Sequence, residues 1–118
     1  MAVTGAHVLL YTREAEQLRA TLRDVFAWEH VDAGDGWLIF ALPPAELGVH
    51  PADGESRHEF LLMCEDVDAT LAELRGRGIR DTGEPSDLGF GVGTTLVLPG
   101  DVRVLLYEPR HETPLAAR

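Results

Sequence analysis

Two histidines and two glutamates occupy matching places in the two halves of this 118-residue chain. His7 opens an apolar stretch in the first half, and Glu59 opens a similar stretch in the second half. His50 and Glu108 each end a mainly apolar segment and stand directly before a proline. Imidazole nitrogens and carboxylate oxygens are common ligands of first-row transition metals. The matching places indicate a tandem duplication that builds one shared site between its halves.

The elements that position these residues follow the order βαβββ in the first half. A helix is expected over 14–26, where apolar residues recur at helical spacing. Short strands, separated by Gly-rich and Pro-rich turns, are expected at 6–11, 28–31, 37–42 and 46–50.

The second half has the same predicted order. A helix is expected over 66–75, with acidic residues in its first turn and Arg75 in its last, as the helix dipole favours. The segment 84–91 is expected to be a loop, and the tail from 110 has little reason to be ordered. Strands are expected at 59–64, 79–81, 92–98 and 102–107.

Composition limits the classes of function. A hydrophobic fraction of 45% with no apolar run long enough to cross a bilayer predicts one soluble domain, residues 1–118, without a membrane partner. The start of the chain lacks a leader pattern, and there is a single cysteine, so a cytoplasmic location is expected. The net charge is −10 and no basic block is present, which disfavours nucleic acid as a partner.

The alternation of side chains along a strand predicts which way the four candidate ligands face. The apolar residues Val8 and Leu10 are expected to meet the helix, and His7 the opposite face. The same parity applied to Glu59 and Glu108 predicts that they also lie away from the helices. Four such groups directed into one cavity would require a metal, a polar partner or a ligand.

Four segments, 6–8, 65–69, 74–78 and 105–109, carry a family pattern. Through them the chain resembles the vicinal oxygen chelate superfamily, which includes glyoxalase I, bleomycin-resistance proteins, fosfomycin-resistance thiol transferases and extradiol dioxygenases. The resemblance implies an α+β fold in which two tandem βαβββ modules, about 5–51 and 58–109, form a curved mixed sheet around a cavity. It also implies a homodimer.

The resemblance further implies metal ligands on the first and last strands of each module, at positions that match His7, His50, Glu59 and Glu108. This set suits Mn, Fe, Co, Ni or Zn. Glu59 and Glu108 are the predicted catalytic carboxylates, able to move a proton beside the metal. His58, next to Glu59, is the lesser candidate, because a shift of one residue turns it to the opposite face.

Two functions follow from the resemblance. The first is a metal-dependent enzyme acting on a small oxygenated metabolite, as a lyase or isomerase, a dioxygenase or a thiol transferase. The alternative is a metal-free protein that binds and sequesters an antibiotic or another small molecule; metal-binding relatives usually carry His where this chain has Glu59. Tyr11, Trp37 and Phe90 are the predicted ligand-binding aromatics.

Overall fold

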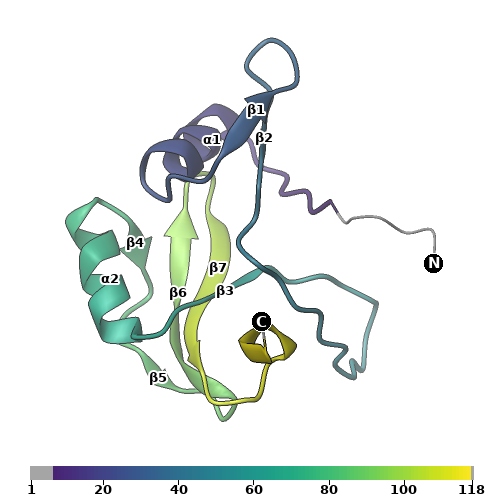
Figure 1. Ribbon diagram of the computed structural model, residues 1–118, viewed down its shortest axis with the longest axis vertical. Coiled ribbons are helices and arrows are strands. Elements are labelled where there is room, and N and C mark those ends of the chain that lie inside the picture. Colours follow the sequence, from purple (N-terminus) through teal and green to yellow (C-terminus); the bar gives the residue numbers. More distant parts are fainter. Residues whose placement is uncertain (1–6, 118) are drawn as a thin grey trace.

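The computed structural model describes residues 7–117 and shows an α+β fold (Figure 1). Its helices are α1 (Ala15–Asp24), α2 (Val67–Gly76) and a short C-terminal 3₁₀ helix, η1 (Pro114–Ala117). Its strands are β1 (His30–Asp32), β2 (Leu38–Phe40), β3 (Leu61–Met63), β4 (Arg80–Asp81), β5 (Ser86–Asp87), β6 (Gly91–Leu98) and β7 (Val102–Pro109). None of the helices in the described part of the chain has the length and apolar character needed to cross a membrane.

The second half forms a mixed five-stranded sheet. Its strands follow the order β3-β7-β6-β4, and β5 also pairs with β6. The pair β3 and β7 is parallel, whereas β6 pairs antiparallel with β4, β5 and β7. The predicted order of strand, helix and three strands is therefore confirmed in this half, with β5 as an additional short strand inside the expected loop.

Helix α2 covers one face of this sheet. The side chain of Asp66 accepts a hydrogen bond from the backbone N–H of Ala69 at 3.0 Å and so caps the start of the helix. Val67, Leu71 and Leu74 recur at i, i+4 and i+7 and are buried on one side of α2. They pack in a single cluster with the inward side chains of β6 and β7, namely Leu96, Leu98, Val104 and Leu106.

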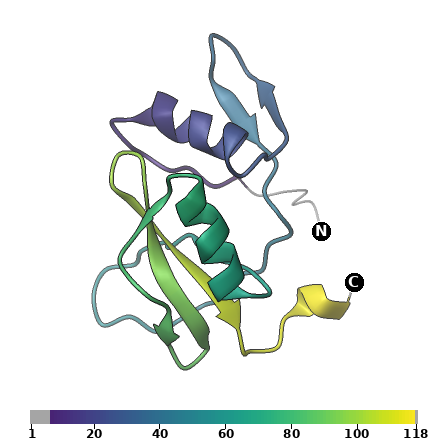
Figure 2. The same cartoon turned by 90° about the vertical axis from the view of Figure 1, so that its left-hand side faces the viewer.

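Helix α1 joins the same hydrophobic cluster. Leu18 is buried in it, and Leu22 packs against it. At the ends of the two helices, the guanidinium of Arg77 donates to the carbonyl oxygen of Asp24 at 2.9 Å, which satisfies a backbone acceptor at the end of α1. Figure 2 shows α1 lying across the end of the sheet, beside α2. The two halves therefore share one continuous core.

The first half contains fewer strands than expected. Residues 7–12 and 46–50 form no strand, so the predicted strands at 6–11 and 46–50 are wrong within the described residues. Only the hairpin of β1 and β2 is present, closed by a turn in which the Asp32 carboxylate accepts from the backbone of Gly34. A strand requires a neighbour to satisfy its backbone groups, and neither segment has one among residues 7–117.

The described part of the tail, residues 110–117, contacts other segments and contains η1, which was not expected. It turns back after β7, and Arg110 pairs with Asp87 at 2.7 Å. Thr113, just before η1, donates to the carboxylate of Glu46. The sequence of the tail did not predict these contacts. Its partners, Asp87 and Glu46, lie in other segments, and local composition gives no information about them.

Candidate functional site

An apolar pocket of about 390 Å³ lies between residues 7–12, α1 and β2. Its volume is in the range of small-molecule sites, which are usually lined by hydrophobic and aromatic side chains with a few polar groups. The chain has two tryptophans, and both line the pocket. The aromatic lining consists of Trp28, Trp37, Phe40 and Phe60.

Polar groups at the pocket are few. His7 lines it from the N-terminal segment, and Arg19 lines it from α1. The Arg19 guanidinium lies 5.0 Å from the centre of the Trp37 ring, within the range of a cation–π interaction. The pocket thus combines planar apolar walls with one cation that the Trp37 ring already engages.

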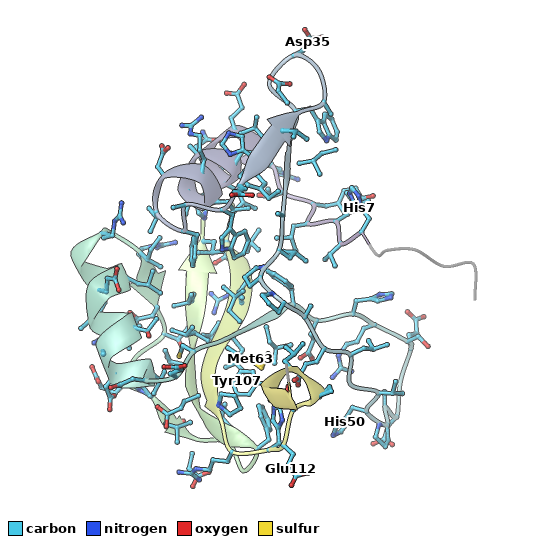
Figure 3. All side chains as sticks on the ribbon, in the orientation of Figure 1. His7, Asp35, His50, Met63, Tyr107 and Glu112 are labelled. Atoms are coloured by element: carbon cyan, nitrogen blue, oxygen red, sulfur yellow. The ribbon has the colours of Figure 1, made fainter. Side chains whose placement is uncertain are left out.

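The predicted metal ligands do not meet. Figure 3 shows His7 and His50 in separate parts of the chain. His50 is exposed, and its Nδ1 lies 2.7 Å from the carbonyl oxygen of Pro51. Glu59 is also exposed and pairs with Arg57 at 3.3 Å. His58, the lesser candidate, is exposed as well.

Glu108 faces α2, so the expectation that it lies away from the helix is wrong. Its Oε1 accepts a hydrogen bond from the backbone N–H of Val67 at 3.1 Å, in the first turn of α2. Glu108 shares its face of β7 with Val104 and Leu106, which pack against the helix. The alternation of side chains along β7 was predicted correctly, but the face that carries Glu108 meets α2 instead of pointing away from it.

Within residues 7–117, no group of three or more His, Cys, Asp or Glu side chains could hold a metal ion. Since His7, His50, Glu59 and Glu108 lie apart and Glu108 is engaged by a helix, the donors of one chain do not fit the metal that the resemblance implies.

The predicted aromatics separate into three places. Trp37 lines the apolar pocket beside His7. Tyr11 is 87% exposed and lines a wider, more polar hollow of about 850 Å³ near the turn between β6 and β7. Phe90 lies against Tyr107, with ring centres 5.2 Å apart. Of the predicted site residues, only His7 and Trp37 are therefore brought together.

A second polar cluster, which the sequence did not indicate, surrounds Tyr107. The Tyr107 hydroxyl lies 2.9 Å from Nε2 of His111, and that nitrogen lies 3.7 Å from Oε2 of Glu46. Burial, and secondarily the charge of Glu46, raises the pKa of Tyr107, so the phenol remains a hydrogen-bond donor at neutral pH. Glu46 and His111 belong to distant segments, so no local spacing connects them.

Two glycines make room for the Tyr107 ring. A Cβ atom added at Gly93 would lie 2.7 Å from Cβ of Tyr107, and one added at Gly91 would lie 2.9 Å from Cδ2 of the same ring. Atoms cannot approach so closely, so β6 needs both glycines beneath this ring. Tyr107 is only 6% exposed as a result of this packing and of the tail above it.

Comparison with solved structures identifies the fold. TnmS3, an antibiotic binding protein from Streptomyces sp. CB03234, superposes with a TM-score of 0.67 at 22% identity, over 92% of this chain and 98% of that one. A member of the glyoxalase/bleomycin resistance protein/dioxygenase superfamily from Sphaerobacter thermophilus DSM 20745 gives 0.61 at 18% identity, over 92% and 99%. Lactoylglutathione lyase from Agrobacterium tumefaciens gives 0.60 at 16% identity, over 92% and 96%.

The chain therefore has the fold of the glyoxalase/bleomycin resistance/dioxygenase superfamily, as the sequence resemblance implied. The similar structures include both an enzyme and an antibiotic-binding protein, so the shared fold alone does not select an activity. No protein-family model matches the sequence, and no curated protein matches it significantly.

Proposed function

We propose that this protein binds a planar, largely apolar small molecule in the 390 Å³ pocket and does so without a metal. The observation that carries the proposal is the gathering of both tryptophans, Phe40 and Phe60 around one pocket of ligand size. Within residues 7–117 of one chain no three donor residues form a metal site, which supports this function over metal-dependent catalysis within a single chain. The antibiotic-binding function of TnmS3, which has the same fold, supports it.

The binding unit is a homodimer in this proposal. Val8 and Leu9 line the pocket yet are 51% and 57% exposed, so the pocket is open on that side. Leu47 and Val49, on the other segment without a strand, are each 91% exposed. Apolar side chains and unpaired backbone on the same segments favour pairing with another chain. The cytoplasmic location expected from the sequence is part of this proposal.

Intrinsic fluorescence tests the proposal directly, because both tryptophans line the pocket. Protein treated with EDTA is titrated with proflavine, a planar aromatic cation, and with 1-anilinonaphthalene-8-sulfonate, an aromatic anion. Saturable quenching together with a rise in melting temperature is expected for at least one of them. Trp37→Ala should weaken binding at least tenfold, and Tyr11→Ala, outside the pocket, should leave it unchanged.

Metal content distinguishes the metal-free binding protein from the metal-dependent enzyme. Protein purified without an affinity tag is analysed by mass spectrometry, alongside His7→Ala and Glu59→Ala. Close to one ion per chain, lost in both variants and required for ligand binding, would overturn the metal-free proposal and favour the metal-dependent enzyme. Equal quenching in wild type and Trp37→Ala would instead show that the ligand lies outside the pocket.

A further inference from the structure

On the face of the five-stranded sheet opposite α2, Tyr107 is in contact with His111 of the chain's own tail. Figure 1 shows η1 and α2 on opposite sides of β6 and β7. In Figure 3, Tyr107 and Met63 are labelled beside η1. The imidazole of His111 lies at the hydroxyl end of Tyr107, with ring centres 5.8 Å apart and planes inclined by 41°. A planar ring therefore already occupies the space beside the Tyr107 hydroxyl.

The hydrogen bonds of His111 indicate which kind of ring fits beside the Tyr107 hydroxyl. Nδ1 lies 2.7 Å from the carbonyl oxygen of Glu112, and because a carbonyl can only accept, Nδ1 carries the hydrogen. In the neutral ring Nε2 is then an acceptor, and the Tyr107 hydroxyl donates to it at 2.9 Å. The Tyr107 hydroxyl thus donates one hydrogen bond to an unprotonated nitrogen of a planar ring.

Phe90 supplies a second aromatic wall. Its ring meets Tyr107 edge to face, at an interplanar angle of 81°, a favourable arrangement for aromatic pairs. Phe90 is 44% exposed, so part of its ring is free to contact a further ring. The absence of side chains at Gly91 and Gly93 keeps Tyr107 seated on the sheet.

The tail is held over this place by few contacts. Besides those of His111, the contacts that the described residues of the tail make with other segments are the hydrogen bond from Thr113 to Glu46, the exposed pair of Arg110 with Asp87, and the hydrogen bond from the backbone N–H of Arg110 to the carbonyl oxygen of Phe90 at 2.8 Å. Exposed ion pairs contribute little to stability, and η1 is only four residues long. Displacement of the tail therefore breaks no part of the hydrophobic cluster.

We propose that Tyr107 and Phe90 form a second small-molecule site, for a planar heteroaromatic ring with an unprotonated acceptor nitrogen, and that His111 occupies this site as an internal ligand. The site is distinct from the pocket that the tryptophans line. A ligand that enters it takes the hydrogen bond of Tyr107 and displaces the tail.

The full chain with His111→Ala is the test, because this change removes the imidazole and leaves a space of its shape. Benzimidazole and indole are matched probes: both are flat bicyclic rings, but only benzimidazole has an acceptor nitrogen. The chain has two tyrosines, so ¹³C labelling of tyrosine gives two easily assigned sets of ring signals. Tyr11, 87% exposed and in another part of the chain, is the internal control.

Benzimidazole is expected to shift the Tyr107 signals of His111→Ala, with at least tenfold higher affinity than for wild type and several-fold higher affinity than indole. His111→Phe fills the space and should bind neither probe there. No shift at Tyr107, or equal affinity in wild type and His111→Ala, would overturn the proposal. Tryptophan fluorescence reports separately on the other pocket.

Thr113→Val keeps the proposal testable if His111→Ala does not fold. This variant loses the hydrogen bond to Glu46 but retains the imidazole. It should bind benzimidazole more tightly than wild type, and trypsin should cleave it faster after Arg110. Unchanged binding in this variant would count against displacement of the tail.

Discussion

At the scale of single residues, Glu108 was predicted to be a catalytic metal ligand, but its carboxylate makes a structural hydrogen bond to α2. Its carboxylate accepts from the backbone N–H of Val67, at the end of α2 where the helix dipole favours negative charge. An N-terminal N–H of a helix has no partner within the helix, so this hydrogen bond satisfies a partly buried donor. The residue that the resemblance designates as a metal ligand thus stabilises the helix.

Glu108→Ala is therefore expected to lower the free energy of unfolding by about 1–2 kcal/mol, as the loss of a helix-capping carboxylate does. Glu59→Ala is the matched control, because Glu59 is exposed and pairs only with Arg57; a change within about 0.5 kcal/mol is expected there. Urea denaturation at pH 7 measures both. Equal stability of the two variants would contradict the structural role of Glu108.

Asp81 provides the clearest pH dependence. Its carboxylate receives two hydrogen bonds from the Arg75 guanidinium, at 2.8 and 2.9 Å, and one from the backbone of Gly83 at 3.0 Å. The hydrogen bonds from Arg75, and then that from Gly83, hold the pKa of Asp81 below its usual value. The ionised carboxylate is thus favoured more in the folded than in the unfolded chain.

The lowered pKa of Asp81 makes the folded protein more stable at neutral pH than at acidic pH. A carboxyl group with a lowered pKa in the folded state contributes stability above its unfolded pKa, about 3.9, and this contribution is lost as the pH falls through the folded pKa. Asp81→Asn should therefore be less stable than wild type at pH 7, and the difference should shrink below about pH 4. Urea midpoints at pH 7, 5, 3.5 and 2.5 measure it, with Asp53→Asn as a control in the exposed linker.

At the scale of elements, the pairing of β6 with β7 depends on small residues as much as on apolar ones. Gly93 is opposite Tyr107 in the antiparallel register, and a Cβ there would meet both the Tyr107 side chain and the carbonyl of Leu106. Gly76, the last residue of α2, has open space around its Cα. The two glycines therefore respond differently to the same substitution.

Gly93→Ala should destabilise the protein by about 1–3 kcal/mol, since the added methyl group overpacks the ladder between β6 and β7. Gly76→Ala should instead raise the stability by up to about 1 kcal/mol, because alanine is the better helix former. Thermal and urea unfolding of both variants measure the difference. Gly93→Ala that is as stable as wild type would show that the Tyr107 ring is free to move off β6.

At the scale of the whole molecule, the unpaired segments of the first half predict self-association. If two chains pair through these segments, the melting temperature rises with protein concentration, because association stabilises the folded state by mass action. Leu47→Glu combined with Val49→Glu places charge on the two most exposed of these apolar side chains, and it should convert a dimer into a monomer.

Light scattering after size exclusion measures the mass, and melting curves over a hundredfold range of concentration measure the coupling. Ala52→Glu, in the exposed linker, is the control for added charge and should remain dimeric. A monomer in the wild-type protein at every concentration would refute the dimer but leave the pocket of Trp28 and Trp37 open to test by fluorescence.

The sequence by itself determined the parts of the fold that local patterns specify. Helix α2, expected over 66–75, is found at Val67–Gly76 because its apolar spacing and its Asp66 cap act within a few residues. The strands β6 and β7 are close to their expected bounds because they are joined by a short turn and pair with each other. The fold that the resemblance implied rests on these elements.

Only the tertiary structure decided the features that depend on contacts between residues far apart in the sequence. Residues 7–12 and 46–50 have strand-like sequences but no neighbouring strand in the part of the chain that the structure describes, so propensity alone misassigned them. Strand parity related Glu108 to its neighbours correctly, but which face meets α2 is a matter of packing. The cluster of Tyr107, His111 and Glu46 joins the C-terminal end of the chain to Glu46, which lies far earlier in the sequence, so their contact forms only after the chain has folded.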